Sequence, residues 1–589
     1  MAKWFVTAKK ADFNQIAAEF GIDPVTARLI RNRDVIGTEN IRQYLRGEIR
    51  DLHDPRLLKD MDLAVEILRK KIAEQAGIRI LGDYDADGIC ATYILYRGLT
   101  ACGAEADTVI PHRIRDGYGI NEALIREASE EGRDTIITCD NGVAAAEQIA
   151  LANTLGLTVI VTDHHEVPYE ELEDGSRRFL LPPAAAVVNP KQPDCGYPYK
   201  GICGAVVAYK LVSCLAESME IQGREEWLEE LVEIAAFATV CDVMELREEN
   251  RILVRYGLEK MKQSKNLGLR ALMAACQVDP QKLKAYQIGF VLGPCINATG
   301  RLDTAQRALT LFGSRSWEEA LETATQLKTL NEQRKDLTLQ GLEAAIERIE
   351  SSSWKDDRVL VVYLPELHES LAGIIAGRLR ERYWKPVFVL TNGEEGVKGS
   401  GRSIDSYHMY DEMTLCKELF TKYGGHKMAA GLSMKEEDVD RFREKLNQCC
   451  RLTPDDLEEK LSIDVAMPIS YLTEKLVEEL ELLEPFGTGN QKPVFAQKDV
   501  HIISGKIFGK NRNVGKYRIT DGLAEYEMVY FGDLQAFGRF LEEKAGKNTV
   551  ERLYHGERVD IALSIAYYPE INTYRGNSSL QIRMTHYSA

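Results

Sequence analysis

The chain has 589 residues, which at about 150 residues per domain predicts roughly four domains. Hydrophobic residues make up 44% of the chain and charged residues 28%, values of ordinary folded proteins that exclude a disordered or fibrous chain. No apolar run reaches the ~18 to 20 residues of a membrane helix, and the first residues lack the apolar core of a signal peptide. We therefore expect a cytoplasmic protein with no membrane partner.

Cysteine spacing and charge narrow the class further. Twelve cysteines are spread from Cys90 to Cys450 without a CxxC pair, which favours reduced thiols over a disulfide framework or structural zinc. The formal net charge of −17 would by itself disfavour a nucleic-acid partner. However, the segment from Gly505 to Arg518 contains five cationic residues and no acid. An acidic chain can therefore still carry a local basic groove.

The predicted elements change in character along the chain. Residues 1–75 show helical apolar spacing, clearest over 61–75. Short apolar strands then alternate with helices, a pattern typical of a parallel sheet covered on both faces. These strands are expected at 78–81, 107–110, 135–139, 157–162 and 185–188. Residues 204–265 are mainly helical, and 316–351 predict one long spacer helix. A second α/β block follows from about 358 to 446, and the last ~130 residues predict a small β-barrel.

Acidic residues and histidines follow three of the predicted strands. Because ligands bind beyond the carboxyl ends of parallel strands, these side chains are expected in one crevice. Asp242, at the end of an apolar helix, is a further candidate. The residues after the strands are Asp83, Asp85, Asp87, Asp140, Asp163, His164 and His165.

Crowded carboxylates require cations, and an Asp/His set without cysteine favours Mn²⁺ or Mg²⁺. Two such ions about 3.5–4 Å apart can activate a water and stabilise the leaving oxygen of a phosphate ester. The alternatives are that Asp140 is only a helix N-cap and that His164 is a core histidine. An EF-hand loop is disfavoured because Ile94 occupies the position of its closing glutamate and a strand flanks the loop. The set predicts a dimetal phosphoesterase.

Seven motifs occur in a characteristic order: GDYDADG (82–88), PHRIRDGYG (111–119), TDHHEVP (162–168), LGPCINATGR (292–301), GSGRSI (399–404), GGHKMAAG (424–431) and EPFGTGN (484–490). With this set the chain resembles the DHH phosphoesterases, and within them the RecJ family of single-strand-specific 5′→3′ DNA exonucleases. The resemblance implies an α/β DHH parallel-sheet domain, joined by a long helix to a smaller DHHA1 α/β domain, plus a C-terminal OB-fold β-barrel. The expected boundaries are 1–75 for an N-terminal helical segment, 76–315 for the DHH domain, 316–352 for the helix, 353–455 for DHHA1 and 456–589 for the OB-fold.

The resemblance also assigns roles in the metal crevice. It makes Asp85, Asp87, Asp140, His164 and Asp242 the ligands of two divalent ions, Mn²⁺ or Mg²⁺, with Asp140 as the bridge. Asp163 would orient this set, as carboxylates behind metal-bound histidines do, and His165 would contact the phosphate. Asp83 is expected in the surrounding shell. Since adjacent side chains diverge, His164 and His165 are not expected to hold one ion together.

The substrate contacts are carried over in the same way. Ser400, Gly401 and Arg402 would bind the 5′-phosphate, through the arginine fork and close backbone approach at glycine. Arg113 and Arg301 are candidates for that pocket, Tyr118 for base stacking, and His426 is expected to face the site. In the OB-fold, a groove would grip the strand with Phe508 and Tyr517 between five cations. These cations are Lys506, Lys510, Arg512, Lys516 and Arg518. Ordinary turns and a solvated basic loop are the alternatives.

Three positions depart from the family. Leu81 stands where many relatives have a histidine ligand, Cys295 where an arginine is usual, and residues 367–370 replace a Trp-His-x-Gly segment. No carboxylate is lost, so we expect an active enzyme that releases 5′-mononucleotides in DNA repair and recombination. It would act as a monomer alongside single-strand binding protein and a helicase. The alternatives are a DHH-family oligoribonuclease or cyclic-dinucleotide phosphodiesterase, which typically lack the C-terminal domain, and a non-catalytic replication scaffold, which would lose metal-site residues.

Overall fold

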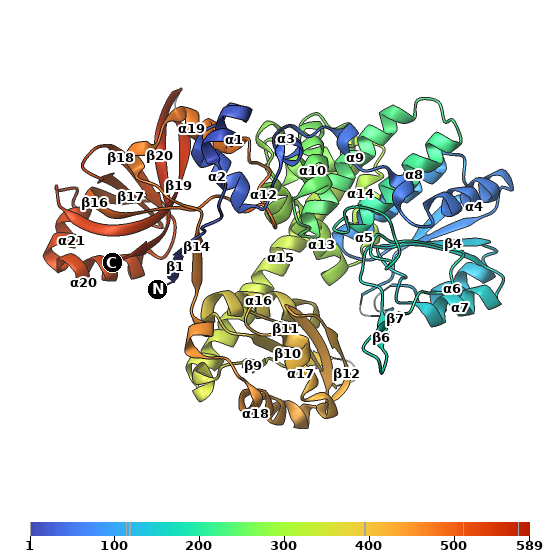
Figure 1. Ribbon diagram of the computed structural model, residues 1–589. Coiled ribbons are helices and arrows are strands. Elements are labelled where there is room, and N and C mark those ends of the chain that lie inside the picture. The colour runs from blue at the N-terminus through green and yellow to red at the C-terminus, as the bar shows by residue number, and fades with distance from the viewer. Residues whose placement is uncertain (1, 114, 117–118, 394–395, 510–511, 575) are drawn as a thin grey trace. The chain divides into compact units, whose positions relative to one another are not determined.

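The computed structural model describes residues 2–113, 115–116, 119–393, 396–509, 512–574 and 576–589 (Figure 1). The chain forms two compact units, one of residues 49–458 and one of residues 1–48 together with 459–589. Tyr118 and Lys510, for which substrate contacts are expected, lie outside the described residues. Over the described ranges, no helix is long and apolar enough to cross a membrane.

A parallel sheet of five strands, in the order β3-β2-β4-β5-β8, forms the centre of the first domain. Its strands are β2 (Ile78–Leu81), β3 (Ala106–Val109), β4 (Thr135–Cys139), β5 (Thr158–Thr162) and β8 (Ala186–Val188). Side chains alternate between the two faces, so Ile136 and Val159 enter one apolar cluster while Ile137 and Ile160 enter another. The sheet is therefore buried on both faces, as predicted.

Helices surround this sheet and extend the domain beyond it. α6 and α7 contribute to the cluster on one face, whereas α4, α5 and α8 contribute to the cluster on the other. The helices are α4 (Met61–Ala73), α5 (Ala86–Ala101), α6 (Glu122–Glu130), α7 (Ala146–Thr154), α8 (Gly204–Ser218), α9 (Arg224–Cys241), α10 (Glu248–Met261), α11 (Leu267–Ala275), α12 (Ala285–Gln287), α13 (Gly293–Leu302) and α14 (Gln306–Phe312). A separate two-stranded hairpin consists of β6 (Tyr169–Glu171) and β7 (Arg177–Phe179).

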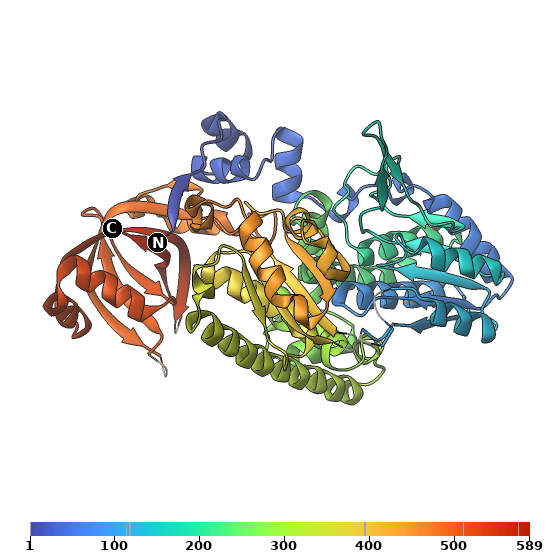
Figure 2. The same cartoon turned by 90° about the horizontal axis from the view of Figure 1, so that it is seen from below.

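One long helix, α15 (Trp317–Glu350), joins this domain to the next (Figure 2). Its 34 residues correspond to a length of about 50 Å. Ala320 and Ala324 are buried in the core of the first domain, and Ala345 and Ile349 in the core of the second. The expected connecting helix is confirmed, and both of its ends are anchored by apolar packing.

The second domain contains a mixed sheet in the order β12-β13-β11-β10-β9. Only β9 and β10 run parallel, and the other neighbours are antiparallel. An apolar cluster covers one face of this sheet, and a second apolar cluster covers β9 and β10 on the other face. The elements are β9 (Leu360–Tyr363), α16 (Ala372–Tyr383), β10 (Val387–Gly393), β11 (Gly396–Arg402), α17 (Met409–Thr414), β12 (Phe420–Gly425), β13 (Ala429–Met434) and α18 (Val439–Cys449).

The other compact unit contains a closed barrel of five strands in the order β16-β17-β18-β20-β19. Pairing of β16 with β19 closes it, and β18 and β20 run parallel while the other neighbours are antiparallel. The predicted α/β architecture with a C-terminal barrel is thus confirmed. The elements are β15 (Val465–Ala466), α19 (Glu474–Glu481), β16 (Phe495–Phe508), β17 (Val514–Thr520), β18 (Glu525–Tyr530), α20 (Leu534–Ala545), α21 (Lys547–Tyr554), β19 (Ile561–Tyr574) and β20 (Asn577–Ser588).

The N-terminal segment differs from its expected extent. Residues 1–48 pack in the unit of the barrel, where Leu29 and Ile30 join the barrel's apolar cluster, whereas residues 49–75 belong to the other unit. Arg33 Nε donates a hydrogen bond to Asn490 Oδ1 at 3.0 Å. Apolar spacing identifies a helix but not the surface on which it packs, so the division could not be read from the pattern. The elements are β1 (Lys3–Val6), which pairs with β14 (Lys460–Ile463), α1 (Phe13–Phe20), α2 (Pro24–Asn32) and α3 (Thr38–Arg46).

Candidate active site and its adjoining cavity

The loop after β2 places two carboxylates at helix N-termini. Asp85 caps α5, and its Oδ1 accepts hydrogen bonds from the amides of Asp87 and Gly88, both at 3.0 Å. The buried Asp87 carboxylate accepts from the amides of Gly204 at 2.6 Å and Ala205 at 2.9 Å, at the start of α8. Helix N-termini favour negative charge, so both carboxylates are held in place before any ion binds.

Asp140 follows β4 in a strained backbone conformation, with φ at +61°. Its amide donates to the carbonyl of Thr162 at 3.1 Å, and its side chain is buried. A Cβ atom added to Gly204 would lie 2.8 Å from Asp140 Cβ, so a glycine is needed there. The next helix, α7, is capped at Ala145 rather than at Asp140. The interpretation of Asp140 as a helix cap is therefore excluded.

His164 lies among three aspartates. Its Nε2 is 3.1 Å from Asp140 Oδ1, 3.7 Å from Asp87 Oδ2 and 3.8 Å from Asp242 Oδ2. Asp242 directly follows the last residue of α9, as the sequence suggested. The buried Nδ1 of His164 has no hydrogen-bond partner among the residues that the structure describes. His164 is thus not a satisfied core histidine, and its surroundings are those of a metal ligand.

Asp163 positions the second histidine. Its Oδ1 accepts hydrogen bonds from the amides of His164 and His165 at 2.7 and 3.1 Å and lies 2.8 Å from His165 Nδ1. Its Oδ2 accepts from the Val143 amide at 2.9 Å. Because Asp163 holds both backbone amides, the two imidazole rings lie on one side, with centroids 4.5 Å apart. The expectation that these side chains diverge was wrong.

Three sets of side chains in this crevice could each hold a metal ion. Asp140 belongs to two of the sets, as expected of a carboxylate that bridges two ions, and His164 also belongs to two. The sets include every predicted ligand and also Asp83. They are Asp140 with His164 and His165, Asp87 with His164 and Asp242, and Asp83 with Asp85 and Asp140. Leu81, in the position of a histidine ligand in many relatives, is buried in the core of the sheet.

The electrostatics of the crevice favour bound cations. Burial, reinforced by neighbouring aspartates, raises the pKa of Asp83 and of Asp242 to about 8. The same causes raise the pKa values of Asp85 and Asp140. Repulsion among ionised carboxylates is relieved when divalent ions neutralise them, and oxygen and imidazole donors suit Mn²⁺ or Mg²⁺. The donor set therefore fits two such ions.

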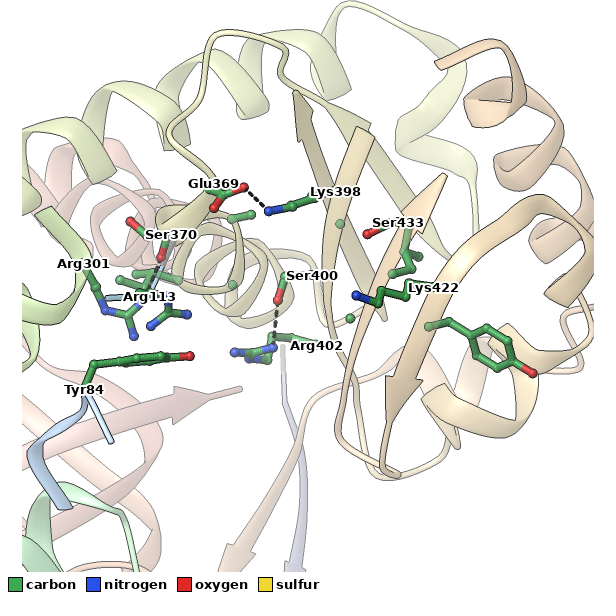
Figure 3. A pocket seen from close by; sticks show the side chains of 17 residues that line it. Tyr84, Arg113, Arg301, Glu369, Ser370, Lys398, Ser400, Arg402, Lys422 and Ser433 are labelled. Carbon is green, nitrogen blue, oxygen red and sulfur yellow. Dashed lines mark hydrogen bonds and ion pairs between the residues drawn. The ribbon is translucent and has the colours of Figure 1, made fainter. Parts of the chain in front are cut away.

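A cavity of about 550 Å³ adjoins the crevice (Figure 3). Tyr84, between Asp83 and Asp85 in sequence, lines it, and the Arg113 guanidinium carbon lies 4.8 Å from the centre of the Tyr84 ring. The other lining side chains come from both domains of this unit. They include Arg301, Glu369, Ser370, Lys398, Ser400, Arg402, Lys422, Tyr423 and Ser433.

Two arginines of the cavity donate hydrogen bonds to backbone oxygens, and no ion pair of either with an acid is found among the described residues. Arg301 Nη1 donates to the carbonyl of Ser370 at 2.6 Å, and Arg402 Nη1 donates to the carbonyl of Gly401 at 2.7 Å. Burial, together with Arg113, lowers the pKa of Arg301 to about 10. Crowded, buried guanidinium groups indicate a site for an anion such as phosphate.

Two expected contributors do not line the cavity. A Cβ atom on Gly401 would lie 2.4 Å from Met409 Sδ and 2.7 Å from Phe388 Cε1. A side chain at this position would therefore point into the apolar core and not into the cavity. His426 is exposed in the turn between β12 and β13, where its amide donates to the carbonyl of Ala429 at 2.8 Å. The glycine at 401 thus serves packing.

Cys295, the second departure from the family, also lies away from the cavity. It is buried, its Sγ is 3.7 Å from Cys276 Sγ, and it accepts from Asn331 Nδ2 at 3.4 Å. The cavity residues that the sequence missed include Tyr84, Glu369, Lys398, Lys422 and Ser433. Alternation along β11 could have revealed Lys398, since it lies two residues before Ser400.

The basic hairpin of the barrel differs in part from its expected form. Tyr517 is buried, and its hydroxyl lies 3.2 Å from that of Tyr554, so it belongs to the barrel core and cannot stack on a base. Its neighbours on the opposite face form ion pairs, Lys516 with Glu527 at 2.7 Å and Arg518 with Glu525 at 3.2 Å. Phe508 is 48% exposed, and Lys506 and Arg512 are exposed as well.

Comparison with known proteins agrees with this architecture. Residues 77–239 match the DHH family N-terminal domain, 356–452 the DHHA1 domain and 463–586 the RecJ OB domain. The single-stranded-DNA-specific exonuclease RecJ of Salmonella typhimurium is 32% identical over 95% of each chain. That of Bacillus subtilis is 33% identical over 90% of this chain, which spans 66% of its length. Crystal structures of Thermus thermophilus RecJ with Mn²⁺ and with Mg²⁺ have TM-scores of 0.81 and 0.76, at 26% and 25% identity, and cover 100% of this chain and 80% and 78% of their own. The chain belongs to the RecJ family of single-stranded-DNA-specific exonucleases.

Proposed function

We propose that this chain hydrolyses single-stranded DNA from its 5′ end, releases 5′-mononucleotides, and acts in DNA repair and recombination. The observation that carries this proposal is that Tyr84, which stands between two aspartates of the metal crevice, also lines a cavity that contains three arginines. A pocket for a terminal phosphate beside the hydrolytic centre selects strand ends. The oligoribonuclease and cyclic-dinucleotide alternatives are disfavoured by the C-terminal barrel, and a scaffold role by the complete carboxylate set.

Five residues would hold the two divalent ions, with Asp140 between them: Asp85, Asp87, Asp140, His164 and Asp242. When bound, the ions supply an activated water and stabilise negative charge on the phosphoryl oxygens. The chain prepares this arrangement by capping hydrogen bonds to Asp85 and Asp87 and by the backbone strain at Asp140. RecJ from Thermus thermophilus has been crystallised with either Mn²⁺ or Mg²⁺, which supports both as cofactors.

His165 would contact the reacting phosphate. Burial lowers the pKa of His165, but the hydrogen bond that its Nδ1 donates to Asp163, together with the negative charge of Asp163, outweighs this and raises the pKa to about 9. The ring is therefore protonated at neutral pH, with Nδ1 donating to Asp163 at 2.8 Å. A donor aimed at developing negative charge stabilises the transition state. Asp163 acts as a positioning residue for this imidazolium.

The terminal phosphate would bind Ser400, Arg402, Arg113 and Arg301. Holding it one nucleotide from the ions would make each product a mononucleotide. On the barrel, Phe508, Lys506 and Arg512 would grip the following strand by stacking and charge. We further propose that the chain acts as a monomer in the cytoplasm, beside single-strand binding protein and a helicase. The twelve cysteines are all free in the structure, which agrees with a reducing compartment.

The test is product analysis on a 5′-phosphorylated single strand labelled at its 3′ end, with Mn²⁺ or with EDTA. We expect Mn²⁺-dependent 5′-mononucleotides and label on progressively shorter strands. Asp140→Ala should abolish turnover, whereas Asp174→Ala, in an exposed turn of the same domain, should not change it. Turnover retained in Asp140→Ala, or label released first, would contradict the proposal.

A further inference from the structure

The cavity beside the metal crevice contains a second row of polar side chains. Lys398 of β11 pairs in register with Ser433 of β13, and Ser433 pairs with Lys422 of β12. The neighbouring row on the same three strands begins with Ser400. Residues two apart on a strand project from the same face, so both rows face one space. All four of these residues line the cavity.

Beside the lysine row, the surface of the sheet is free of side chains at two glycine positions. Residues two apart on a strand are spaced by about 7 Å. In the row of Ser400 the partners are Gly431 and Gly424, which have no side chains to fill this space. A Cβ on Gly424 would meet no atom within 4 Å, and one on Gly431 only a backbone oxygen at 3.9 Å. In Figure 3 the Lys422 ammonium group points toward Ser400.

The charge of the cavity exceeds what one terminal phosphate needs. Five cationic side chains and one carboxylate, Glu369, are among its described lining residues. Glu369 Oε2 lies 2.8 Å from Lys398 Nζ and fixes that lysine. Lys422 has no ion pair within the described part of the chain, so its charge is uncompensated there. A phosphate monoester carries only about −1.5 to −2.

We propose that Lys398, Ser433 and Lys422 form a second phosphate subsite, which holds the next phosphoryl group of a strand whose 5′ end carries a diphosphate or triphosphate. The inference rests on the proposed function. Tyr84, beside the metal crevice, lies at one end of the cavity, Arg402 is in the middle, and the lysine row is beyond it (Figure 3). Internal phosphates of the strand would run toward Tyr84, whereas groups that extend the 5′ end would run toward the lysines.

The reaction at such an end is the same hydrolysis. Water attacks the phosphorus of the first internal phosphodiester, and the 3′ oxygen of the first nucleoside leaves and takes up a proton. The products are a nucleoside 5′-triphosphate with a free 3′-hydroxyl and a shortened strand with a 5′-monophosphate. The polyphosphate itself is not cleaved.

The test compares two substrates of one sequence, a single strand with a 5′-triphosphate and the same strand with a 5′-monophosphate. We expect the full chain with Mn²⁺ to release an intact nucleoside triphosphate from the first, identified by mass. Lys422→Gln should lower the triphosphate-to-monophosphate ratio of kcat/KM about tenfold, the order of one charge-assisted hydrogen bond. Lys422→Arg should retain most of the ratio. The control is Lys427→Gln, exposed in the same hairpin but outside the cavity, which should leave the ratio unchanged.

Three outcomes would overturn the inference. An equal loss on both substrates would assign Lys422 to an internal phosphate. An unchanged ratio would remove Lys422 from any subsite for the 5′ extension. Cleavage of the monophosphate strand alone by the unmodified chain would show that the cavity rejects polyphosphate ends. Failure of the proposed function is distinguishable, because no strand of either kind would then be cut.

Discussion

Binding of Mn²⁺ to the metal-free chain is expected to release protons at neutral pH. The reason is the raised pKa, about 8, that burial and neighbouring aspartates give to Asp83 and Asp242. A divalent ion stabilises ionised carboxylates and therefore displaces the protons that these groups carry. His165 should keep its proton, because the main cause that raises its pKa is the hydrogen bond to Asp163, which is not a proposed metal ligand; Asp242 and Asp87 contribute less.

The size of the effect follows from these values. A carboxyl group with a pKa of about 8 is about 90% protonated at pH 7 and about 10% at pH 9. Asp83 and Asp242 together should therefore release about 1.8 protons at pH 7 and about 0.2 at pH 9. Asp85 and Asp140, whose pKa values are also raised, add to the release at pH 7.

The same shifts fix the sign of a stability change. The folded-state pKa values lie above the ordinary value of about 3.9 for an unfolded chain, so the folded state binds more protons between about pH 4 and pH 8. The stabilising contribution is complete below about pH 4 and is lost as the pH rises through about 8. The free energy of unfolding of the metal-free chain should fall by up to about 1.4 kcal/mol per pH unit for each such carboxyl group.

Isothermal titration calorimetry in two buffers of different ionisation enthalpy measures the proton count directly. Titrations with Mn²⁺ at pH 7 and at pH 9 give the number of protons released at each pH. Asp242→Asn should reduce the release at pH 7 by about 0.9 protons, since one of the two groups is lost. Release of no protons at pH 7, or of equal numbers at both pH values, would refute the electrostatic description of the crevice.

Three further predictions concern the cavity, the barrel and the strand beside the cavity. Arg402→Ala should erase the preference for a 5′-phosphate over a 5′-hydroxyl end in kcat/KM, and a retained preference would remove Arg402 from the pocket. Phe508→Ala should weaken binding of single-stranded DNA, measured by fluorescence anisotropy, without changing the melting temperature. Tyr517→Ala should instead destabilise the barrel by roughly 3–5 kcal/mol, and the reverse pattern would contradict their assignment to surface and core. Gly401→Ala should lower stability to denaturant by about 1–3 kcal/mol through overpacking, whereas Gly424→Ala should have a much smaller effect; equal losses would contradict the packing role.

The parallel sheet was predictable because its signals are local. The strands are short, apolar and followed by aspartate loops, and the observed bounds of β2 and β4 coincide with the predicted ranges. Convergence of the acidic loops also followed, since parallel strands bring their carboxyl ends to one edge. The second domain and the barrel depended on the family resemblance as well, because hydrogen-bonded pairing between distant strands leaves no pattern in a single sequence.

The packing and hydrogen-bond partners of individual side chains could not be predicted from the sequence. Tyr517 lies between Lys516 and Arg518, and its sequence context is that of a stacking residue, yet alternation sends it into the barrel core. Arg33 and Asn490 are 457 positions apart and bond to each other. The EPFGTGN motif therefore has a structural role. The side-chain amide of Asn490 also donates hydrogen bonds to the carbonyls of Leu483 and Pro485, both at 2.8 Å. No local signal indicates such partners.

The GSGR motif contains, in one strand, a feature that the sequence predicted and a feature that it did not. As a glycine-rich loop it would expose its backbone to a phosphate, but residues 399–402 end β11 and alternate between two faces. Ser400 and Arg402 project into the cavity, whereas Cβ atoms on the two glycines would lie 2.3 Å from Leu390 Cδ2 and 2.4 Å from Met409 Sδ. The glycines let the core approach the strand, and that approach positions the polar pair on the other face. Substituting either glycine should therefore change phosphate recognition through a shift of β11.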